Sequence, residues 1–127
     1  MNGSLPDSLG NLTFLTSIRM FANRLTGTIP HTLGKLTQLT DVDLAENWIT
    51  GTIPESFSAL INMSTFLVGS NYLSGTISHV FQHYTNITRI GLAANILTGS
   101  LPEYFSTLTK THFFGPGQQL FEWNHPE

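Results

Sequence analysis

Apolar and polar positions along this chain recur with a strict period of 24 residues. A turn segment built around a glycine returns without an insertion at Gly3, Gly27, Gly51, Gly75 and Gly99. A second block fits L-x-x-L-x-L-x-x-N-x-L, with Ile, Val, Met or Phe at some apolar positions, in residues 15–25, 39–49, 63–73 and 87–97. Self-similarity at a fixed period of about 20–50 residues predicts a stack of equivalent units.

Each copy of this second block is expected to contain one short strand. Apolar and polar residues alternate in Ile18-Arg19-Met20, as they do on a half-buried strand. We expect equivalent strands one repeat apart to stack in parallel, at a spacing of about 4.8 Å. The apolar side chains of adjacent coils then bury one another, which no single repeat can achieve alone.

A helical turn is expected on the opposite side of each coil. Apolar pairs three residues apart, such as Leu33 and Leu36, fit one short helical or 3-10 turn. A proline presets φ for this turn at Pro6, Pro30, Pro54 and Pro102. Ser78 takes the place of the proline in the remaining repeat, where we expect a small local loosening.

With these three segments in register, the chain resembles the plant-type leucine-rich repeat family, whose repeats read LxxLxxLxLxxNxLTGxIPxxLxxL. The resemblance covers residues 2 to about 110. It implies an α/β fold, namely a right-handed solenoid (horseshoe) with parallel short strands and short helical or 3-10 turns. It also implies an inward ladder of side-chain amides at Asn23, Asn47, Asn71 and Asn95.

The two ends of the chain depart from the pattern. Residues 1–110 form the expected leucine-rich repeat array, with four full repeats plus partial ends, and residues 111–127 form an irregular C-terminal cap or tail. Met1 is in register with Leu25, so the chain begins in mid-repeat. We therefore expect a fragment of a longer array or a truncated product, whose open strand edge permits edge-to-edge self-association.

The strand residues that point away from the core are predicted to form a concave face. The resemblance implies that this face binds a peptide or a protein. The candidate ligand-binding residues are Arg19, Phe21, Asp41, Asp43, Glu46, Thr65, Leu67 and Arg89. Arg19 and Asp43 lie one strand apart in one column, where a lateral ion pair contributes about 0–1 kcal/mol.

A further column follows the asparagines and contains an aromatic patch, Trp48 and Tyr72, between Arg24 and Ile96. Exposed aromatic side chains beside an arginine form a binding hot spot or a cation–π pair. The same side chains also suit lateral packing between coils, and the sequence leaves both interpretations open.

Repeated hydroxyl groups and acceptor asparagines suggest two other surface roles. Two parallel Thr/Ser ladders run through the turn segments, such as Thr50-Gly51-Thr52, and resemble the flat surfaces of ice-binding solenoids. The N-x-S/T motifs permit glycosylation in a secretory setting at Asn2, Asn11, Asn62 and Asn86.

Composition excludes several classes of function. The net charge is −3 and charged residues make up 10% of the chain, so no basic patch points to nucleic acid. The absence of cysteine excludes disulfides, thiolate metal sites and cysteine nucleophiles. His79 and His83 have an i, i+4 spacing, but no carboxylate near them in sequence completes a metal site.

The sequence therefore predicts neither an enzyme nor a cofactor. It contains no nucleophile with a paired base, and Asp41 and Asp43 lie on an open ladder rather than in a pocket. No apolar run reaches the roughly 18 residues of a membrane span. The first ten residues also lack the basic start and apolar run of a secretory signal, so the chain itself does not indicate a compartment.

The expected function is peptide or protein recognition on the concave face. The resemblance implies a place in a cell-surface receptor-like protein with an extracellular location. Three alternatives remain: a secreted enzyme inhibitor of the polygalacturonase-inhibitor type, an ice-binding solenoid, and a truncated fragment with no function of its own.

Overall fold

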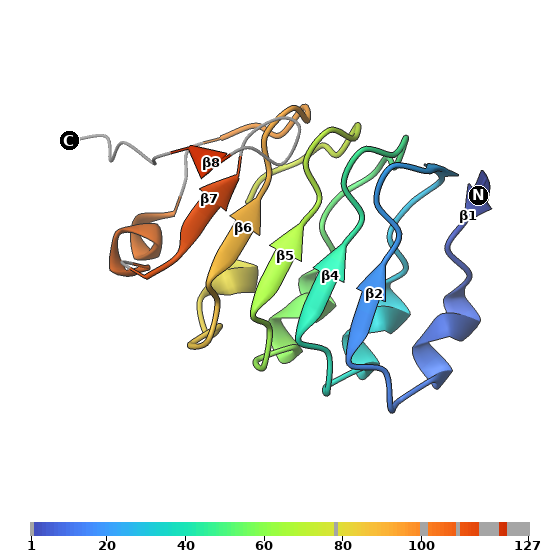
Figure 1. Cartoon of the computed structure of the whole chain (residues 1–127), viewed down its shortest axis with the longest axis horizontal. Coiled ribbons are helices and arrows are strands. Elements are labelled where there is room, and N and C mark those ends of the chain that lie inside the picture. The colour runs from blue at the N-terminus through green and yellow to red at the C-terminus, as the bar shows by residue number, and fades with distance from the viewer. Residues whose placement is uncertain (1, 78, 100–101, 109, 115–119, 122–127) are drawn as a thin grey trace.

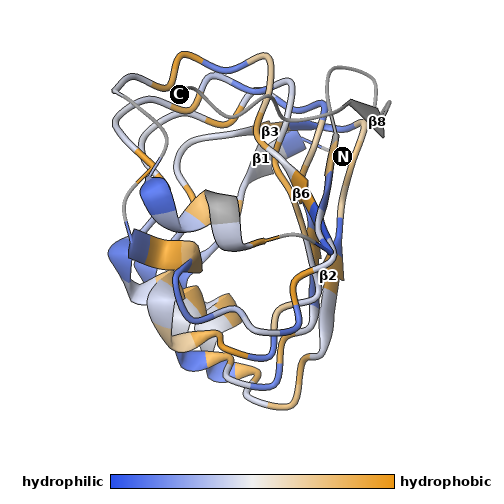
Figure 2. Cartoon of the chain, turned by 90° about the vertical axis from the view of Figure 1, so that its left-hand side faces the viewer, coloured by the Kyte–Doolittle hydropathy of each residue, from blue (hydrophilic) through white to orange (hydrophobic). Residues whose placement is uncertain are grey.

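The computed structural model describes residues 2–77, 79–99, 102–108, 110–114 and 120–121. These residues form a solenoid in which one short strand per coil lines one side and one 3-10 helix per coil lines the other (Figure 1). Figure 2 is turned by 90° and shows the strands and the helices on opposite sides of one closed outline. The stacked architecture predicted from the 24-residue period is confirmed.

Six strands form the main sheet, in the order β2-β4-β5-β6-β7-β8. Their bounds are Ser17–Arg19 for β2, Asp41–Asp43 for β4, Thr65–Leu67 for β5, Arg89–Gly91 for β6, His112–Phe114 for β7 and Leu120–Phe121 for β8. A second, two-stranded sheet pairs β1 (Asn2–Ser4) with β3 (Arg24–Thr26) in parallel.

Strand pairing between β2 and β6 follows the sequence period directly. Ile18 pairs with Val42, Val42 with Phe66, and Phe66 with Ile90, all in parallel. Each step is 24 residues, so equivalent side chains stack over one another. The ladder continues beyond the strand ends, where the backbone N–H of Ala22 donates to Ala45 O at 2.9 Å.

The predicted helical turns are 3-10 helices. They comprise η1 (Asp7–Asn11), η2 (His31–Lys35), η3 (Glu55–Ala59), η4 (His79–Phe81) and η5 (Glu103–Thr107). Except for η4, each follows its proline directly, and Pro30 has φ −64° and ψ 133° at the residue before η2. Ser78 lies outside the described residues, so its expected loosening stays a prediction.

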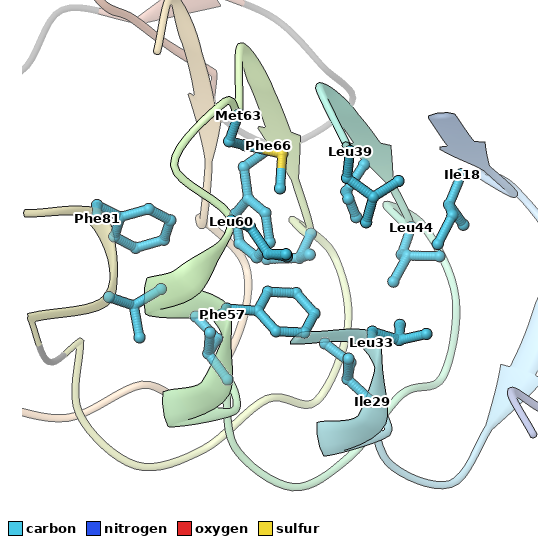
Figure 3. Close-up of a cluster of buried hydrophobic side chains, with 14 of the residues drawn as sticks. Ile18, Ile29, Leu33, Leu39, Leu44, Phe57, Leu60, Met63, Phe66 and Phe81 are labelled. Carbon is cyan, nitrogen blue, oxygen red and sulfur yellow. The ribbon is translucent and has the colours of Figure 1, made fainter. Parts of the chain in front are cut away.

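The core runs along the inside of the coils as one continuous apolar cluster. Figure 3 shows it between the strand side and the helix side, with Ile18, Leu44 and Phe66 facing Leu33 and Phe57. Edge-to-face aromatic contacts link its later coils, since Phe66 lies 5.9 Å from Phe57 and 5.2 Å from Phe81 between ring centroids.

The sheet continues beyond residue 110, where the expected cap or tail begins. Strand β7 pairs in parallel with β6, but Arg89 pairs with His112, a step of 23 residues instead of 24. Strand β8 then pairs antiparallel with β7. Because the step changes at this point, the 24-residue pattern in the sequence does not place β7.

Candidate functional site

The turns that follow β2, β4, β5 and β6 are each held by an asparagine side chain. The Asn47 amide nitrogen donates to Met20 O, Leu44 O and Ala45 O at 2.9–3.2 Å, and its oxygen accepts from Leu25 N at 3.0 Å. Asn71 and Asn95 make equivalent contacts one and two coils further on. Asn23 donates to Met20 O and Phe21 O. These bonds give the exposed strand side chains a rigid support.

The concave face is the side of the main sheet that points away from the core. Its candidate residues differ in exposure. Arg19, Phe21, Glu46 and Arg89 are exposed, and Asp41 and Asp43 are half-buried. The exposed group places one aromatic side chain and charges of both signs on a surface about 15 Å long, given four strands at about 4.8 Å.

Two predicted ligand-binding residues are buried. Thr65 has a relative exposure of 8% and Leu67 of 2%, and every residue of β5 is buried. In β5, Thr65 and Leu67 pair with Asp41 and Asp43 of β4 on one side and with Arg89 and Gly91 of β6 on the other. In this structure they support the concave face and offer little surface to a ligand.

The ion pair on this face runs diagonally. Arg19 Nη2 lies 3.7 Å from Asp41 Oδ2, whereas the sequence suggested a lateral pair with Asp43. Thr40 Oγ1 also donates to Asp41 Oδ2 at 2.9 Å, and Asp43 Oδ1 accepts from Ala45 N at 3.2 Å. These contacts fix the two carboxylates on the strand surface, where an exposed pair contributes about 0–1 kcal/mol.

A feature that the sequence did not reveal lies after β2, β4, β5 and β6. The residue before each ladder asparagine has a left-handed backbone, with φ of 57–58° at Ala22, Glu46, Ser70 and Ala94. Residues 46–48 and 70–72 lie around an open hollow of about 440 Å³. We call it the rim hollow; it is lined by Glu46, Asn47, Trp48, Ser70, Asn71, Tyr72 and Ala94.

The aromatic patch belongs to this hollow. Trp48 and Tyr72 have relative exposures of 51% and 54%, so about half of each side chain stays open to solvent. Their backbones are held by the preceding coil, since Trp48 N donates to Leu25 O and Tyr72 N to Ile49 O, both at 2.8 Å. The patch therefore presents aromatic surface on a fixed backbone.

The remaining sequence candidates lie on other surfaces. The four acceptor asparagines of the glycosylation motifs are exposed. In the hydroxyl ladder, the side chains of Thr50, Ser74 and Thr98 donate to the glycine carbonyl of the preceding coil at 3.3 Å. Part of that ladder's hydrogen-bonding capacity is thus used within the solenoid.

Neither a metal site nor a membrane span is found in the part of the chain that the structure describes. No group of three or more His, Cys, Asp or Glu side chains there is placed to hold a metal ion. His79 and His83 are exposed, and the ring of His79 lies 6.2 Å from that of Tyr104. No helix among these residues has the length and apolarity to cross a bilayer.

Two tyrosines on the helix side have perturbed pKa values. Burial, and secondarily the charge of Tyr104, raise the pKa of Tyr84, whose O–H donates to Phe57 O at 2.5 Å. Burial raises the pKa of Tyr104 to about 12, while the bond that its hydroxyl accepts from Phe81 N acts in the opposite direction. Both phenols connect coils far from the concave face, so these shifts reflect packing.

The chain is similar to known leucine-rich repeat proteins. A family model described as Leucine Rich Repeat matches residues 14–36 and 38–60. No curated protein sequence matches the chain.

Several solved structures superpose closely on the chain. The plant peptide hormone receptor RGFR1 in complex with RGF2 is 36% identical with a TM-score of 0.85, over 90% of this chain and 18% of that one. The Arabidopsis receptor kinase HAESA ectodomain with an IDA peptide hormone is 31% identical with a TM-score of 0.84, over 89% and 19%. The BIR2 ectodomain from Arabidopsis thaliana is 29% identical with a TM-score of 0.80, over 93% and 66%. The chain thus spans less than a fifth of the two hormone-bound ectodomains.

Proposed function

Since the chain belongs to the plant-type leucine-rich repeat family, we propose that its concave face binds an extended peptide, as part of the extracellular region of a receptor-like protein. The observation that carries this proposal is the exposed group on the concave face. Phe21, Arg19 and Arg89 project from a sheet whose backbone is held coil by coil. Two similar ectodomains were solved with peptide hormones, RGF2 and IDA.

The size of the surface limits the ligand. A length of about 15 Å accommodates four or five residues of an extended peptide that runs across the strands, at about 3.3 Å per residue. A standard protein interface buries about 800 Å² per partner, which exceeds what the four short strands that carry the candidate residues, β2, β4, β5 and β6, offer. A short peptide segment fits this surface better than a folded protein does, and we expect affinities in the micromolar range or weaker.

A peptide selection tests this proposal. The purified chain is immobilised, random twelve-residue peptides are selected on it, and the enriched peptides are measured by calorimetry. We expect Phe21→Ala to weaken their binding about tenfold, because an exposed aromatic side chain is a typical anchor in an interface. Arg89→Ala should weaken the binding of those peptides that carry an acidic residue.

Glu55→Ala is the matched control, since Glu55 is exposed at the first residue of η3 on the opposite side of the coil. Its binding constants should equal those of the unmodified chain. If Phe21→Ala and Glu55→Ala change the affinity for the enriched peptides equally, the peptides bind away from the concave face. A selection that enriches nothing would contradict the proposed function.

A further inference from the structure

The rim hollow has a rigid floor with few free polar groups. Asn47 and Asn71 line it, but their amide groups are engaged with backbone atoms of their own and the preceding coil. Glu46 N donates to Gly69 O at 2.9 Å, which joins the two coils at the mouth of the hollow. The groups left to meet a ligand are the Glu46 carboxylate, the Ser70 hydroxyl and the two aromatic side chains.

These groups favour a cation. A carboxylate beside exposed aromatic faces attracts a guanidinium or ammonium group by charge and by the ring quadrupole. No basic side chain is among the described residues that line the rim hollow. A sugar would need several free donors and acceptors, and the asparagine amides that would supply them are already engaged.

The residues equivalent to Glu46, Asn47 and Trp48 one coil earlier line a different hollow, at the N-terminal end of the stack. There an open hollow of about 410 Å³ is lined by Asn2, Ala22, Asn23 and Arg24. Ala22 stands at the position of Glu46, and Arg24 at the position of Trp48. The backbone is equivalent, with φ of 58° at both Ala22 and Glu46. The chemistry of the rim hollow therefore comes from its own side chains rather than from the shape of the coil.

We propose that the rim hollow is a specificity pocket for a basic residue, Arg or Lys, of a bound peptide. The cation lies against Trp48 and Tyr72 and pairs with Glu46. Because Glu46 lies three residues after Asp43, the last residue of β4, the hollow adjoins the end of the strand surface on which a peptide is proposed to lie. This inference rests on the proposed function for its biological setting, while cation binding can be measured without any peptide.

The first test titrates the chain with N-acetyl-arginine methylamide as the probe and monitors binding by ¹⁵N NMR. The chain has two tryptophans, Trp48 and Trp123, so a Trp123→Phe background leaves the Trp48 indole as a single reporter. We expect saturable shifts of the Trp48 indole and the Tyr72 amide at millimolar concentrations, and binding at least about fivefold weaker for the uncharged citrulline analogue. Equal binding of the two analogues, or no shift at Trp48, would overturn the inference.

Three variants and a sugar complete this test. Glu46→Gln keeps the shape of the hollow and removes only the charge. It should lower the affinity for the arginine probe about fivefold or more. Glu55→Gln removes a carboxylate from η3 and should leave the binding unchanged. Trp48→Ala should abolish the response at the Tyr72 amide. Shifts produced by cellotriose but not by the arginine probe would assign the hollow to carbohydrate instead.

The peptide selection separates this inference from the proposed function. If both hold, enriched peptides contain Arg or Lys at one fixed position, and Glu46→Gln relaxes the preference at that position. If enriched peptides respond to Phe21→Ala but show no basic preference, the concave-face proposal stands and the specificity pocket is refuted. If nothing is enriched while the arginine probe still binds, the pocket stands and the peptide-binding proposal fails.

Discussion

At the scale of single residues, the buried amide of Asn47 holds the backbones of two coils together. Its relative exposure is 3%, and it satisfies one backbone N–H and three carbonyl groups from two coils. Backbone groups buried without a partner each cost about 1–3 kcal/mol. One side chain therefore stabilises the end of a strand, the following turn and the contact with the preceding coil.

Replacing this amide tests its role. Asn47→Ala should lower the free energy of unfolding by about 3 kcal/mol. The backbone N–H of Leu25 and the carbonyl groups that accept from the Asn47 amide, such as Met20 O, would lose this partner. Asn62→Ala, at an exposed asparagine that donates to Thr37 O, should cost about 0.5 kcal/mol or less. Denaturant unfolding monitored by circular dichroism measures both values, and equal costs would contradict the ladder's role.

The sequence predicted which strand residues are neighbours in the stack, but it did not predict how exposed their side chains are. The 24-residue step places Thr65 and Leu67 in the outward-facing columns, yet both are buried. Likewise Arg19 contacts Asp41, although the columns suggested Asp43. Spacing defines which residues are neighbours, whereas rotamers and the packing around a strand determine which atoms meet. The left-handed backbone at Glu46 and Ser70 had no sequence signal, because only glycine and asparagine commonly mark that conformation.

At the scale of elements, neighbouring 3-10 helices lie so close together at two glycines that a Cβ there would clash with the next helix. A Cβ placed on Gly34 of η2 would lie 2.6 Å from Ser56 Cβ and 2.7 Å from Ser56 O of η3. Gly10 of η1 approaches Thr32 of η2 in the same way. At the equivalent position of η3, Ser58 is exposed and carries a side chain. The close approach is therefore a property of the first helices in the stack.

This approach determines the effect of a methyl group. Gly34→Ala should lower the free energy of unfolding by about 2 kcal/mol, because the steric clash with Ser56 outweighs the better backbone propensity of alanine. Ser58→Ala changes the equivalent residue without this contact and should stay within about 0.5 kcal/mol of the unmodified chain. Thermal and denaturant unfolding give both numbers. A stabilising Gly34→Ala would show that the helices separate at little cost.

At the scale of the whole molecule, stability depends on contacts between neighbouring coils. The fully buried side chains concentrate in the middle of the stack, where Leu33, Val42, Phe57 and Phe66 have no exposed surface. Towards the ends, core-facing residues such as Leu15 and Leu108 are only partly buried. In a solenoid each coil gains stability from the coil on either side, so burial and stability should both fall from the centre outwards.

Native-state hydrogen exchange measures this gradient. We expect the slowest amide exchange in β4 and β5, and exchange at least about tenfold faster in β2 and β7, because outer coils open without disrupting the centre. Phe66→Ala should accelerate exchange throughout the central coils. Uniform protection from β2 to β7 would instead indicate a single cooperative unit.

The period, the parallel stacking, the 3-10 turns and the positions of the ladder asparagines were all accessible from the amino-acid order alone. They depend on local spacing, on the fixed φ of proline and on apolar positions that only a neighbouring coil can bury. The burial of Leu67, the partner of Arg19, the 23-residue step into β7 and the rim hollow emerged only in three dimensions. Each of these depends on how side chains from successive coils meet, and that depends on backbone direction and packing across the stack.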